Sequence, residues 1–428
     1  MKVMVVGGGG REHAICWKIA QSPLLTKLYC APGNPGIEAV AECIAIQPDA
    51  VEQLASFAEE RGMDLVVIGP ELPLTLGLAD ELEARGMPVF GPTRAAARLE
   101  GSKVFAKEFM ERHGIPTARF VVVSDADAAQ SAALDFGLPV VLKADGLAAG
   151  KGVLIPENED ELAKALAILF EERRFGAASD QVVVEECLEG EEVSVIALSD
   201  GHGIVPFATS KDYKRIGEGD EGPNTGGMGA HSPAGIFSAE AEADAMDTVM
   251  RPTIDGMAEE GSPFRGVLYA GLMLTEAGPR VLEFNVRLGD PEAQALLPRL
   301  SADLLAVCVD GAATTGFQTD ELPSAAPACA CLVLASSGYP GEPVSGEEIS
   351  GLEEASELPD VVIFHAGTRV SGDHVVTAGG RVLNVCATGS DLEDALDKAY
   401  DAADRISWPG KVVRRDIGRR VVERQGGS

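Results

Sequence analysis

The sequence predicts an α/β fold of several modules, with a parallel βαβ domain first and a mixed α/β module last. Three observations predict it. The chain has 428 residues, too many for one core, so three or four modules of about 100–200 residues are expected. The start of the chain alternates short apolar strands with helices of about 10–15 residues, as in βαβ units on a parallel sheet. Hydrophobic residues make up 46% of the chain and charged residues 24%, a composition typical of globular proteins.

The first module is predicted to contain strands at 2–6, 24–30, 64–68 and 88–90 and helices at 12–21, 51–61 and 76–85. A helix should then run from about Ser102 to His113, because Gly114 and Pro116 supply the usual stop signals. Residues 119–188 predict a small α+β unit, with strands at 119–123, 140–143 and 181–185 and helices at 126–136 and 160–170.

A longer α/β block follows to about residue 318, with long strands at 193–198, 266–274 and 280–285. The stretch 323–327 begins and ends with proline and is predicted to be a linker. Strands at 328–333, 361–364 and 381–387 and a helix at 392–406 then form the last module. The predicted domains are therefore residues 1–101, 102–188, 189–324 and 325–428.

The formal net charge of −32 argues against nucleic acids and acidic membranes as partners, because both need a cationic footprint. The sequence contains no run of about 18 apolar residues that would predict a membrane span. The N-terminal strand leaves no place for a signal peptide, so we expect a cytoplasmic protein, with its eight scattered cysteines reduced. Such a charge would repel anionic substrates in dilute buffer. We therefore hypothesise that the protein is adapted to high salt, which screens that repulsion.

Lysine is rare, with 12 in the chain, and seven of them fall between residues 103 and 214. In a chain that avoids lysine, these seven are candidate phosphate contacts: Lys103, Lys107, Lys143, Lys151, Lys164, Lys211 and Lys214. Lys107 and Lys164 lie in helical patterns, so they are predicted to be solvated surface residues instead.

A run of glycines, which includes Gly8, Gly9 and Gly10, follows the first strand and opens a helix. Glycines here let backbone approach a phosphate and leave N–H groups at the helix start free to bind it. The run does not fit the G-x-G-x-x-G dinucleotide fingerprint, and the second strand ends without an acid for a ribose, so NAD is disfavoured. A substrate phosphate site and a packing turn remain the alternatives. Glu71 follows the strand 64–68 at the carboxyl edge of the sheet and is a candidate for an amine or a ribose hydroxyl.

Two further segments are candidate nucleotide contacts. Lys143 ends a strand, and Gly150, Lys151 and Gly152 continue into a glycine-rich loop that is not a P-loop but could close over phosphates as a lid. The next strand runs into acids, and its end suits an adenine edge and ribose hydroxyls. By itself that second pattern fits a solvated acidic turn equally well. The residues concerned are Glu185, Glu186, Leu188 and Glu192.

The most informative run is 280–292, in which Glu283, Asn285 and Arg287 alternate with apolar residues. Alternation places all three on one face of a strand, while Leu282, Phe284 and Val286 should face the core. Two oxygen ligands beside a guanidinium suit magnesium-bound phosphates, with the arginine stabilising charge on a transferred group. A second charged segment, from Asp212 to Arg215, precedes a glycine-rich stretch and could order over a substrate; an ordinary surface loop is the alternative.

Taken together, these segments resemble the ATP-grasp enzymes and, among them, the phosphoribosylamine–glycine ligase family. The resemblance covers nearly the whole chain. It is carried by VGGGGREHA at 6–14, APGNPG at 31–36, GPELPL at 69–74, LEGSKVFAKEFM at 99–110, VLKADGLAAGKGV at 141–153, GPNTGGMGAHSP at 222–233, EFNVRLGDPEAQ at 283–294, FHAGT at 364–368, GGRVLNV at 379–385 and RRDIG at 414–418. The run from Arg287 to Gln294 resembles the family's signature and is the most specific of these.

The resemblance implies an ATP-grasp fold with a small α+β lid, and it implies roles for particular residues. Lys103 and Lys143 match phosphate-contacting lysines; Glu185, Leu188 and Glu192 match adenine and ribose positions. Glu283 and Asn285 match magnesium ligands, and Arg287 and Asp212 match catalytic substrate and phosphate contacts. Within the signature, Asp290 and Pro291 are candidate contacts to the substrate phosphate or amine. Gly271 stands where other ATP-grasp enzymes often place a further acid. Lys211 and Tyr213 stand where the family commonly has Gln and His, His231 where it often has Tyr, and Leu288 where Phe is frequent.

The implied activity is ATP-dependent ligation of glycine to 5-phosphoribosylamine through glycyl phosphate, with Mg²⁺ or Mn²⁺ as cofactor, in a monomer or weak homodimer. Three alternatives stay open. They are an ATP-grasp ligase for another carboxylate, a nucleotide-binding regulatory module without catalysis, and, least favoured, an NAD-dependent oxidoreductase.

Overall fold

The computed structural model describes residues 1–147, 152–313, 316–319 and 321–426. Its N-terminal domain contains a five-stranded parallel sheet in the order β3-β2-β1-β4-β5. The predicted parallel sheet is confirmed, although β3 was not among the four predicted strands. The strands are β1 (Lys2–Gly7), β2 (Lys27–Pro32), β3 (Glu42–Cys43), β4 (Leu65–Ile68) and β5 (Val89–Phe90), and the helices are α1 (Gly10–Ile19), α2 (Val51–Arg61), α3 (Glu71–Leu76) and α4 (Leu78–Ala84). The single helix predicted at 76–85 is wrong in its start. Two helices meet at Gly77, whose φ of +89° favours glycine.

A four-stranded antiparallel sheet in the order β6-β9-β7-β8 forms the small α+β unit, the lid. It follows α5 (Arg98–Gly101) and α6 (Lys103–Arg112) and consists of β6 (Phe120–Val123), α7 (Ala126–Phe136), β7 (Val140–Ala144), β8 (Val153–Leu154), α8 (Glu159–Leu166) and β9 (Val182–Glu186). The predicted elements are all present, although the helix predicted at 160–170 continues beyond α8 as a π-helical turn, Ala167–Glu171. The lid has its own core, which includes Val140, Leu142 and Val184.

The remaining chain builds one antiparallel sheet of eight strands, in the order β16-β15-β10-β11-β14-β17-β21-β18. Its strands are β10 (Glu191–Asp200), β11 (Ile204–Asp212), β14 (Gly229–Ser232), β15 (Arg265–Thr275), β16 (Gly278–Asn285), β17 (Ala328–Ala335), β18 (Val361–His365) and β21 (Arg381–Gly389). The C-terminal strands thus continue the central sheet through the β14–β17 pairing. The long strands predicted here are confirmed within about two residues at each end, whereas β11 and β14 were not predicted.

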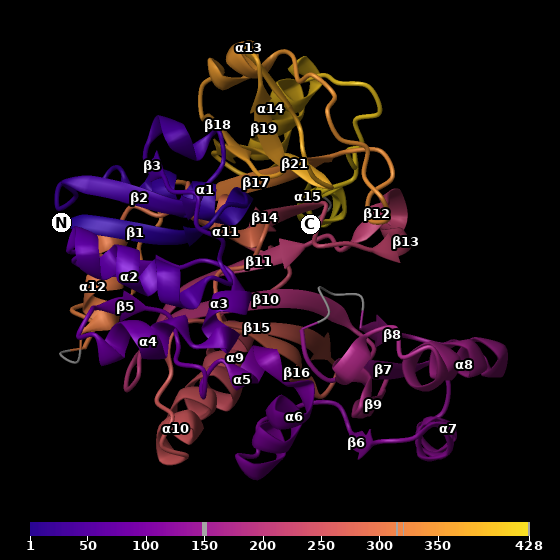
Figure 1. Ribbon diagram of the computed structural model, residues 1–428. Coiled ribbons are helices and arrows are strands. Elements are labelled where there is room, and N and C mark those ends of the chain that lie inside the picture. Colours follow the sequence, from indigo (N-terminus) through magenta and orange to yellow (C-terminus); the bar gives the residue numbers. More distant parts are fainter. Residues whose placement is uncertain (148–151, 314–315, 320, 427–428) are drawn as a thin grey trace.

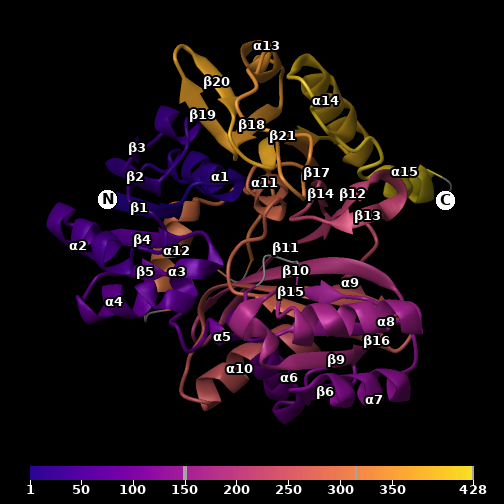
Figure 2. The same cartoon turned by 45° about the vertical axis from the view of Figure 1, so that its right-hand side comes forward.

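Two hairpins and seven helices of the described chain flank this sheet. The hairpins are β12 (Arg215–Gly217) with β13 (Glu221–Asn224) and β19 (Thr368–Ser371) with β20 (His374–Thr377); the helices are α9 (Ala239–Ala245), α10 (Arg251–Glu259), α11 (Glu292–Leu296), α12 (Leu304–Ala312), α13 (Leu352–Ser356), α14 (Leu392–Arg405) and α15 (Arg419–Gly426). In Figures 1 and 2, the lid and the C-terminal strands lie at opposite ends of the molecule, with β10 and β15 crossing between them.

One core joins the N-terminal domain to the central sheet. It contains Val5 of β1 and Ile15 of α1, together with Leu198 of β10, Leu296 of α11 and Phe364 of β18. All eight cysteines are free, and Cys329 and Cys331 lie buried on β17. Among the described residues, no helix combines the length and apolar character needed to cross a bilayer.

Candidate active site

The end of β16 carries the predicted row of polar side chains. Phe284 and Val286 are buried in the core, whereas Glu283, Asn285 and Arg287, which alternate with them, are partly exposed. The three polar residues therefore share one face, as the alternation predicts. The prediction that Leu282 faces the core is wrong, because a bulge opposite Gly271 and Leu272 shifts the register at this residue. Leu282 is half-buried, and its carbonyl accepts a hydrogen bond from Lys143 Nζ at 2.9 Å.

Three lysines from separate parts of the chain, Lys103, Lys143 and Lys214, act on the charge of Glu283. Lys214 Nζ lies 3.6 Å from Glu283 Oε1 and 3.2 Å from Glu192 Oε2. Lys103 begins α6 and donates to the carbonyl of Gly146 at 2.8 Å. Burial alone would raise the pKa of Glu283, but the charges of nearby lysines, Lys214 first, lower it below its ordinary value. The carboxylate is therefore ionised at neutral pH.

Lys107 is buried, so its prediction as a surface lysine is wrong. It is 2% exposed, and its Nζ lies 2.9 Å from Glu185 Oε2 and donates to Thr117 Oγ1 at 2.6 Å. Lys143 Nζ lies 3.0 Å from the other oxygen, Glu185 Oε1. Glu185 thus lies between two ammonium groups, and burial lowers the pKa of Lys107 to about 8. Helical spacing could have placed Lys107 on the buried face, since it lies three residues from Val104, whereas Lys164 is exposed as predicted.

Arg287 is fixed by two carboxylates, only one of which was a candidate from the sequence. Its Nη2 donates to Glu100 Oε1 at 2.8 Å and to Asn285 Oδ1 at 2.9 Å, and its Nε donates to Glu71 Oε2 at 3.3 Å. The second oxygen of Glu100 accepts the Val286 N–H at 2.8 Å. Burial raises the pKa of Glu100, whereas the charges of Arg287 and Arg11 outweigh burial at Glu71 and lower its pKa. No sequence signal distinguished Glu100, because its partners are about 190 residues away in the chain.

A cavity of about 230 Å³ adjoins this row of residues. It is lined by Glu192, Val193, Ser194, Asp212, Lys214, Tyr269, Gly271 and Leu272. Within the part of the chain that the structure describes, Asp212 Oδ1 is buried and has no hydrogen-bond partner. Burial and the charge of Glu292 raise the pKa of Asp212 well above its ordinary range. Gly271 pairs with Glu283 across the strands, and a Cβ there would approach Glu283 Cγ to 3.4 Å. The cavity is therefore lined by polar side chains that include both an acid, Glu192, and a lysine, Lys214.

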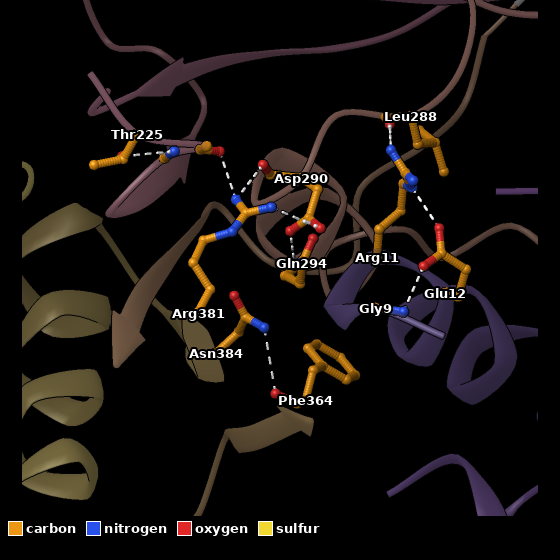
Figure 3. Close-up of polar contacts among 12 residues, drawn as sticks. Gly9, Arg11, Glu12, Thr225, Leu288, Asp290, Gln294, Phe364, Arg381 and Asn384 are labelled. Carbon is orange, nitrogen blue, oxygen red and sulfur yellow. Dashed lines mark hydrogen bonds and ion pairs between the residues drawn. The ribbon is translucent and has the colours of Figure 1, made fainter. Parts of the chain in front are cut away.

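The glycine run after β1 lies near Asp290, since a Cβ on Gly9 would approach Asp290 Oδ2 to 3.6 Å (Figure 3). The expectation that its N–H groups are free is wrong for Gly9, whose N–H donates to Glu12 Oε2 at 2.7 Å. Arg11 Nε lies 2.6 Å from Glu12 Oε1, so the arginine balances the negative charge of Glu12. A Cβ on Gly8 would lie 2.6 Å from the carbonyl oxygen of Gly33, and one on Gly10 would lie 2.2 Å from Asn384 Nδ2. Close packing therefore explains two of these glycines.

Arg381 of β21, which the sequence did not single out, reaches this end of the site (Figure 3). Its Nη1 donates to the Asp290 carbonyl at 2.7 Å, its Nη2 lies 3.1 Å from Asp290 Oδ2, and Gln294 Nε2 donates to Asp290 Oδ1 at 2.7 Å. Gln294 Oε1 and Asn384 Oδ1 are buried without hydrogen-bond partners among the described residues. The only available signal was an arginine at the start of an apolar strand, directly after two glycines.

The other predicted residues lie around the two ends of the cleft. Glu186 binds Arg119 through the backbone N–H at 2.9 Å and Nε at 2.7 Å, and Leu188 is half-buried in the turn before β10. Pro291 packs against Gly227, where a Cβ would approach Pro291 Cδ to 2.5 Å. Gly152 is buried, and its carbonyl accepts from the Ala144 N–H at 2.9 Å. The predictions for Gly150 and Lys151 fall outside the described residues.

Comparison with known proteins decides the family. Models of the N, ATP-grasp and C domains of phosphoribosylglycinamide synthetase match residues 1–100, 101–293 and 329–420. The chain belongs to the phosphoribosylglycinamide synthetase family. A member from Mesorhizobium japonicum, named phosphoribosylamine–glycine ligase, is 50% identical over the full length of both chains. The crystal structure of phosphoribosylamine–glycine ligase from Thermotoga maritima is 35% identical, with a TM-score of 0.85, covering 97% of this chain and 100% of that one.

Fold similarity extends beyond the phosphoribosylglycinamide synthetase family. The biotin carboxylase domain of Hydrogenobacter thermophilus 2-oxoglutarate carboxylase, solved with MgADP and bicarbonate, has a TM-score of 0.74 at 18% identity, covering 96% of this chain and 91% of that one. The chain therefore has the ATP-grasp fold, as the sequence predicted.

Proposed function

We propose that this chain is an ATP-dependent ligase that joins glycine to 5-phosphoribosylamine, yielding glycinamide ribonucleotide, ADP and phosphate. The reaction would proceed through glycyl phosphate and would serve purine synthesis in the cytoplasm. The observation that carries the proposal is the polar row at the end of β16, where Lys214 lies 3.6 Å from Glu283 and Arg287 is held by Glu100, in a family member 50% identical to a named ligase over its whole length. We propose Mg²⁺, or Mn²⁺ in its place, as the metal.

ATP is proposed to lie between the lid and the central sheet. Lys103 and Lys143 would contact its phosphates, and the strand end from Glu185 to Leu188 and Glu192 would hold adenine and ribose. Glu283 and Asn285 would hold the metal. The described residues contain no group of three or more Asp, Glu, His or Cys placed to bind a metal ion, so phosphate oxygens would complete its coordination, as is usual for Mg²⁺. When bound, the metal would neutralise phosphate charge.

The first step would be attack of a glycine carboxylate oxygen on the γ-phosphorus of ATP, breaking the bond to the leaving ADP. Arg287, held by Glu100 and Glu71, would stabilise charge on the transferred phosphoryl group. In the second step the phosphoribosylamine nitrogen would attack the carbonyl carbon, lose a proton and expel phosphate. Asp212 is proposed to face glycine, because it lines the polar cavity beside Lys214 and its Oδ1 is buried with no hydrogen-bond partner among the described residues.

The ribonucleotide substrate is proposed to bind at the far end, between the N-terminal domain and β21. The candidates from the sequence are Gly8, Gly9, Gly10, Glu71, Asp290 and Pro291, and Arg381 joins them. Arg381 donates to Asp290, and the amide oxygens of Gln294 and Asn384 have no donor within the described part of the chain. A bound phosphate would compete with Asp290 for the guanidinium.

The test is ADP release with glycine plus freshly prepared 5-phosphoribosylamine, compared with other amino acids and other amines. We expect turnover only with the named pair and recovery of glycinamide ribonucleotide. Turnover with a different carboxylate and none with glycine would establish the alternative ligase. Nucleotide binding without any turnover would favour a regulatory module. Gel filtration at several concentrations would separate a monomer from a weak homodimer.

A further inference from the structure

Tyr213 lies between two residues of the proposed site and faces away from both. Asp212 and Lys214 line the 230 Å³ cavity, whereas the Tyr213 side chain is 6% exposed and belongs to the C-terminal core with Ile417 and Leu396. Side chains alternate along extended chain, so this division is the expected one. The backbone of Tyr213 is bonded to β14 and its connection, since its N–H donates to the Gly229 carbonyl at 3.0 Å and its carbonyl accepts the Met228 N–H at 2.8 Å. Whatever holds the Tyr213 side chain therefore also holds its two neighbours.

The Tyr213 hydroxyl is the middle of a directed chain of hydrogen bonds. His231 Nδ1 lies 2.9 Å from the Pro233 carbonyl, which only accepts, so Nδ1 carries the proton and Nε2 is an acceptor. Tyr213 Oη lies 3.3 Å from His231 Nε2 and donates to it, and the Gly418 N–H donates to the same hydroxyl at 2.9 Å. Burial lowers the pKa of His231 to about 4, so it stays neutral at neutral pH. Every polar group in this hydrogen-bond network has a partner, in buried surroundings where an unpaired polar group would be costly.

The Gly418 end of this chain belongs to a rigid segment, residues 414–418, which we call the C-terminal clamp. Arg414 is 1% exposed; its Nη1 donates to Asp220 Oδ1 at 2.9 Å and to the Arg215 carbonyl at 3.1 Å, and Nε and Nη2 bind Asp416. Its guanidinium also lies 5.2 Å from the centre of the Tyr213 ring. Gly418 has a φ of +72°, and a Cβ there would lie 2.7 Å from Leu396 Cδ1. The clamp therefore holds both Tyr213 and the β12–β13 hairpin that begins directly after Lys214.

We propose that Tyr213 and His231 are positioning residues for the ligation reaction. Through the hydrogen bond between their side chains, they hold Asp212 against the cavity and Lys214 between Glu192 and Glu283. This proposal rests on the proposed function, because Asp212 is assigned to glycine and Lys214 contacts Glu283, which is assigned to the metal. Lys214 Nζ lies 3.2 Å and 3.6 Å from its two acids, so a backbone shift of about 1 Å would change both contacts. Neither Tyr213 nor His231 touches the cavity itself.

The test compares Tyr213→Phe with Tyr400→Phe, a matched control on the same clamp. The Tyr400 hydroxyl donates to the Arg414 carbonyl and accepts the Ile417 N–H, each at 3.2 Å, but Tyr400 belongs to α14 and has no hydrogen bond to the Asp212–Lys214 strand. Both variants remove one hydroxyl with two partners. Tyr213→Phe should lower kcat about tenfold to a hundredfold, with little change in the KM for ATP, whereas Tyr400→Phe should keep kcat within about twofold of wild type.

Amide hydrogen exchange provides a readout that does not depend on turnover. Tyr213→Phe should speed exchange in the peptide covering residues 211–216 about tenfold, and Tyr400→Phe should not. His231→Asn serves if Tyr213→Phe fails to fold. The asparagine amide can still donate to the Pro233 carbonyl but offers no acceptor at the Nε2 position, and the same losses are expected. Equal kcat and equal exchange in the Tyr213 and Tyr400 variants would overturn the positioning role. Absence of ligase activity in the wild type would instead refute the proposed function, and the exchange comparison would still stand alone.

Discussion

Replacing Glu100 by glutamine tests how Arg287 is held, because one carboxylate bonds both the Arg287 side chain and the adjacent backbone. Glu100 Oε1 accepts from Arg287 Nη2 and Oε2 accepts the Val286 N–H, both at 2.8 Å. Glutamine is close in shape but has one acceptor oxygen, so either its NH₂ faces the Val286 N–H or it faces the guanidinium. One of the two bonds must be lost in either orientation.

The size of the effect follows from this geometry. Removing one partner of a buried ion pair costs about 3–5 kcal/mol. Glu71 remains 3.3 Å from Arg287 Nε and the glutamine keeps one bond, so the loss should be nearer about 2 kcal/mol. If most of that loss falls on the bound transition state, at about 1.4 kcal/mol per tenfold, kcat should fall roughly 10- to 30-fold. The KM for ATP should change little, because Arg287 is assigned to the transferred phosphoryl group.

The assay is steady-state ADP release with all three substrates, beside urea unfolding of each variant. The control is Glu260→Gln, which removes a charge from a surface carboxylate 2.9 Å from Arg112 and 3.0 Å from His113. Exposed pairs contribute about 0–1 kcal/mol, so this control should leave kcat unchanged. A Glu100→Gln enzyme with wild-type kcat, or a control that loses as much activity, would show that the carboxylate does not position Arg287.

Four further predictions concern the metal, a buried lysine, the ribonucleotide end and the surface charge. Glu283→Gln should weaken ATP binding at least about tenfold in Mg²⁺ and not in EDTA, by calorimetry; equal affinities in Mg²⁺ would contradict the metal assignment. For Lys107, burial lowers the folded pKa to about 8, below the value of about 10.4 expected in the unfolded chain. Between these two pKa values the unfolded chain binds more protons than the folded protein, so the free energy of unfolding rises with pH. Between pH 8 and about 9.5, the free energy of unfolding of the wild type, measured in urea, should therefore increase by about 1–2 kcal/mol relative to that of Lys107→Met. A difference between the two proteins that stays constant with pH would refute the pKa shift. Arg381→Met should raise the KM for 5-phosphoribosylamine severalfold and leave the KM for glycine unchanged; a rise in both would place Arg381 elsewhere. Because the net charge is −32, the thermal unfolding midpoint should rise as KCl increases toward about 2 M, and full stability in dilute buffer would rule out salt adaptation.

Local pattern predicted the parts of the fold and site that depend on neighbours in sequence. The parallel N-terminal sheet follows from apolar strands separated by helices. The shared face of Glu283, Asn285 and Arg287 follows from the period of a strand, which Phe284 and Val286 keep by their burial. The exception, Leu282, lies at a bulge that depends on the register of β15, and a single strand's sequence carries no record of its partner's register.

Residues that act through distant contacts could not be predicted in this way. Glu100 pairs with Arg287, and Arg381 with Asp290, across separations of 187 and 91 residues. A lysine in a helical pattern is usually solvated, so the sequence predicts Lys107 at the surface; its partner Glu185 on β9, which balances the buried charge, is 78 residues away in the chain. The sequence gives no reason to link Tyr213 with His231, yet they are the two ends of one hydrogen bond.

An acidic surface is compatible with an anionic substrate, because the repulsion from surface charges and the direct contacts in the site act over different distances. At about 0.15 M ionic strength, charges on the exposed surface are largely screened beyond about 8 Å. Within the cleft, Lys214 lies 3.2 Å and 3.6 Å from two carboxylates, and Arg287 lies 2.8 Å and 3.3 Å from two more. Each cation is therefore matched by the protein's own acids before ATP arrives, and nucleotide phosphates must compete with those acids for it. Recognition of ATP then depends on these few contacts, whereas the net charge governs how stability responds to salt.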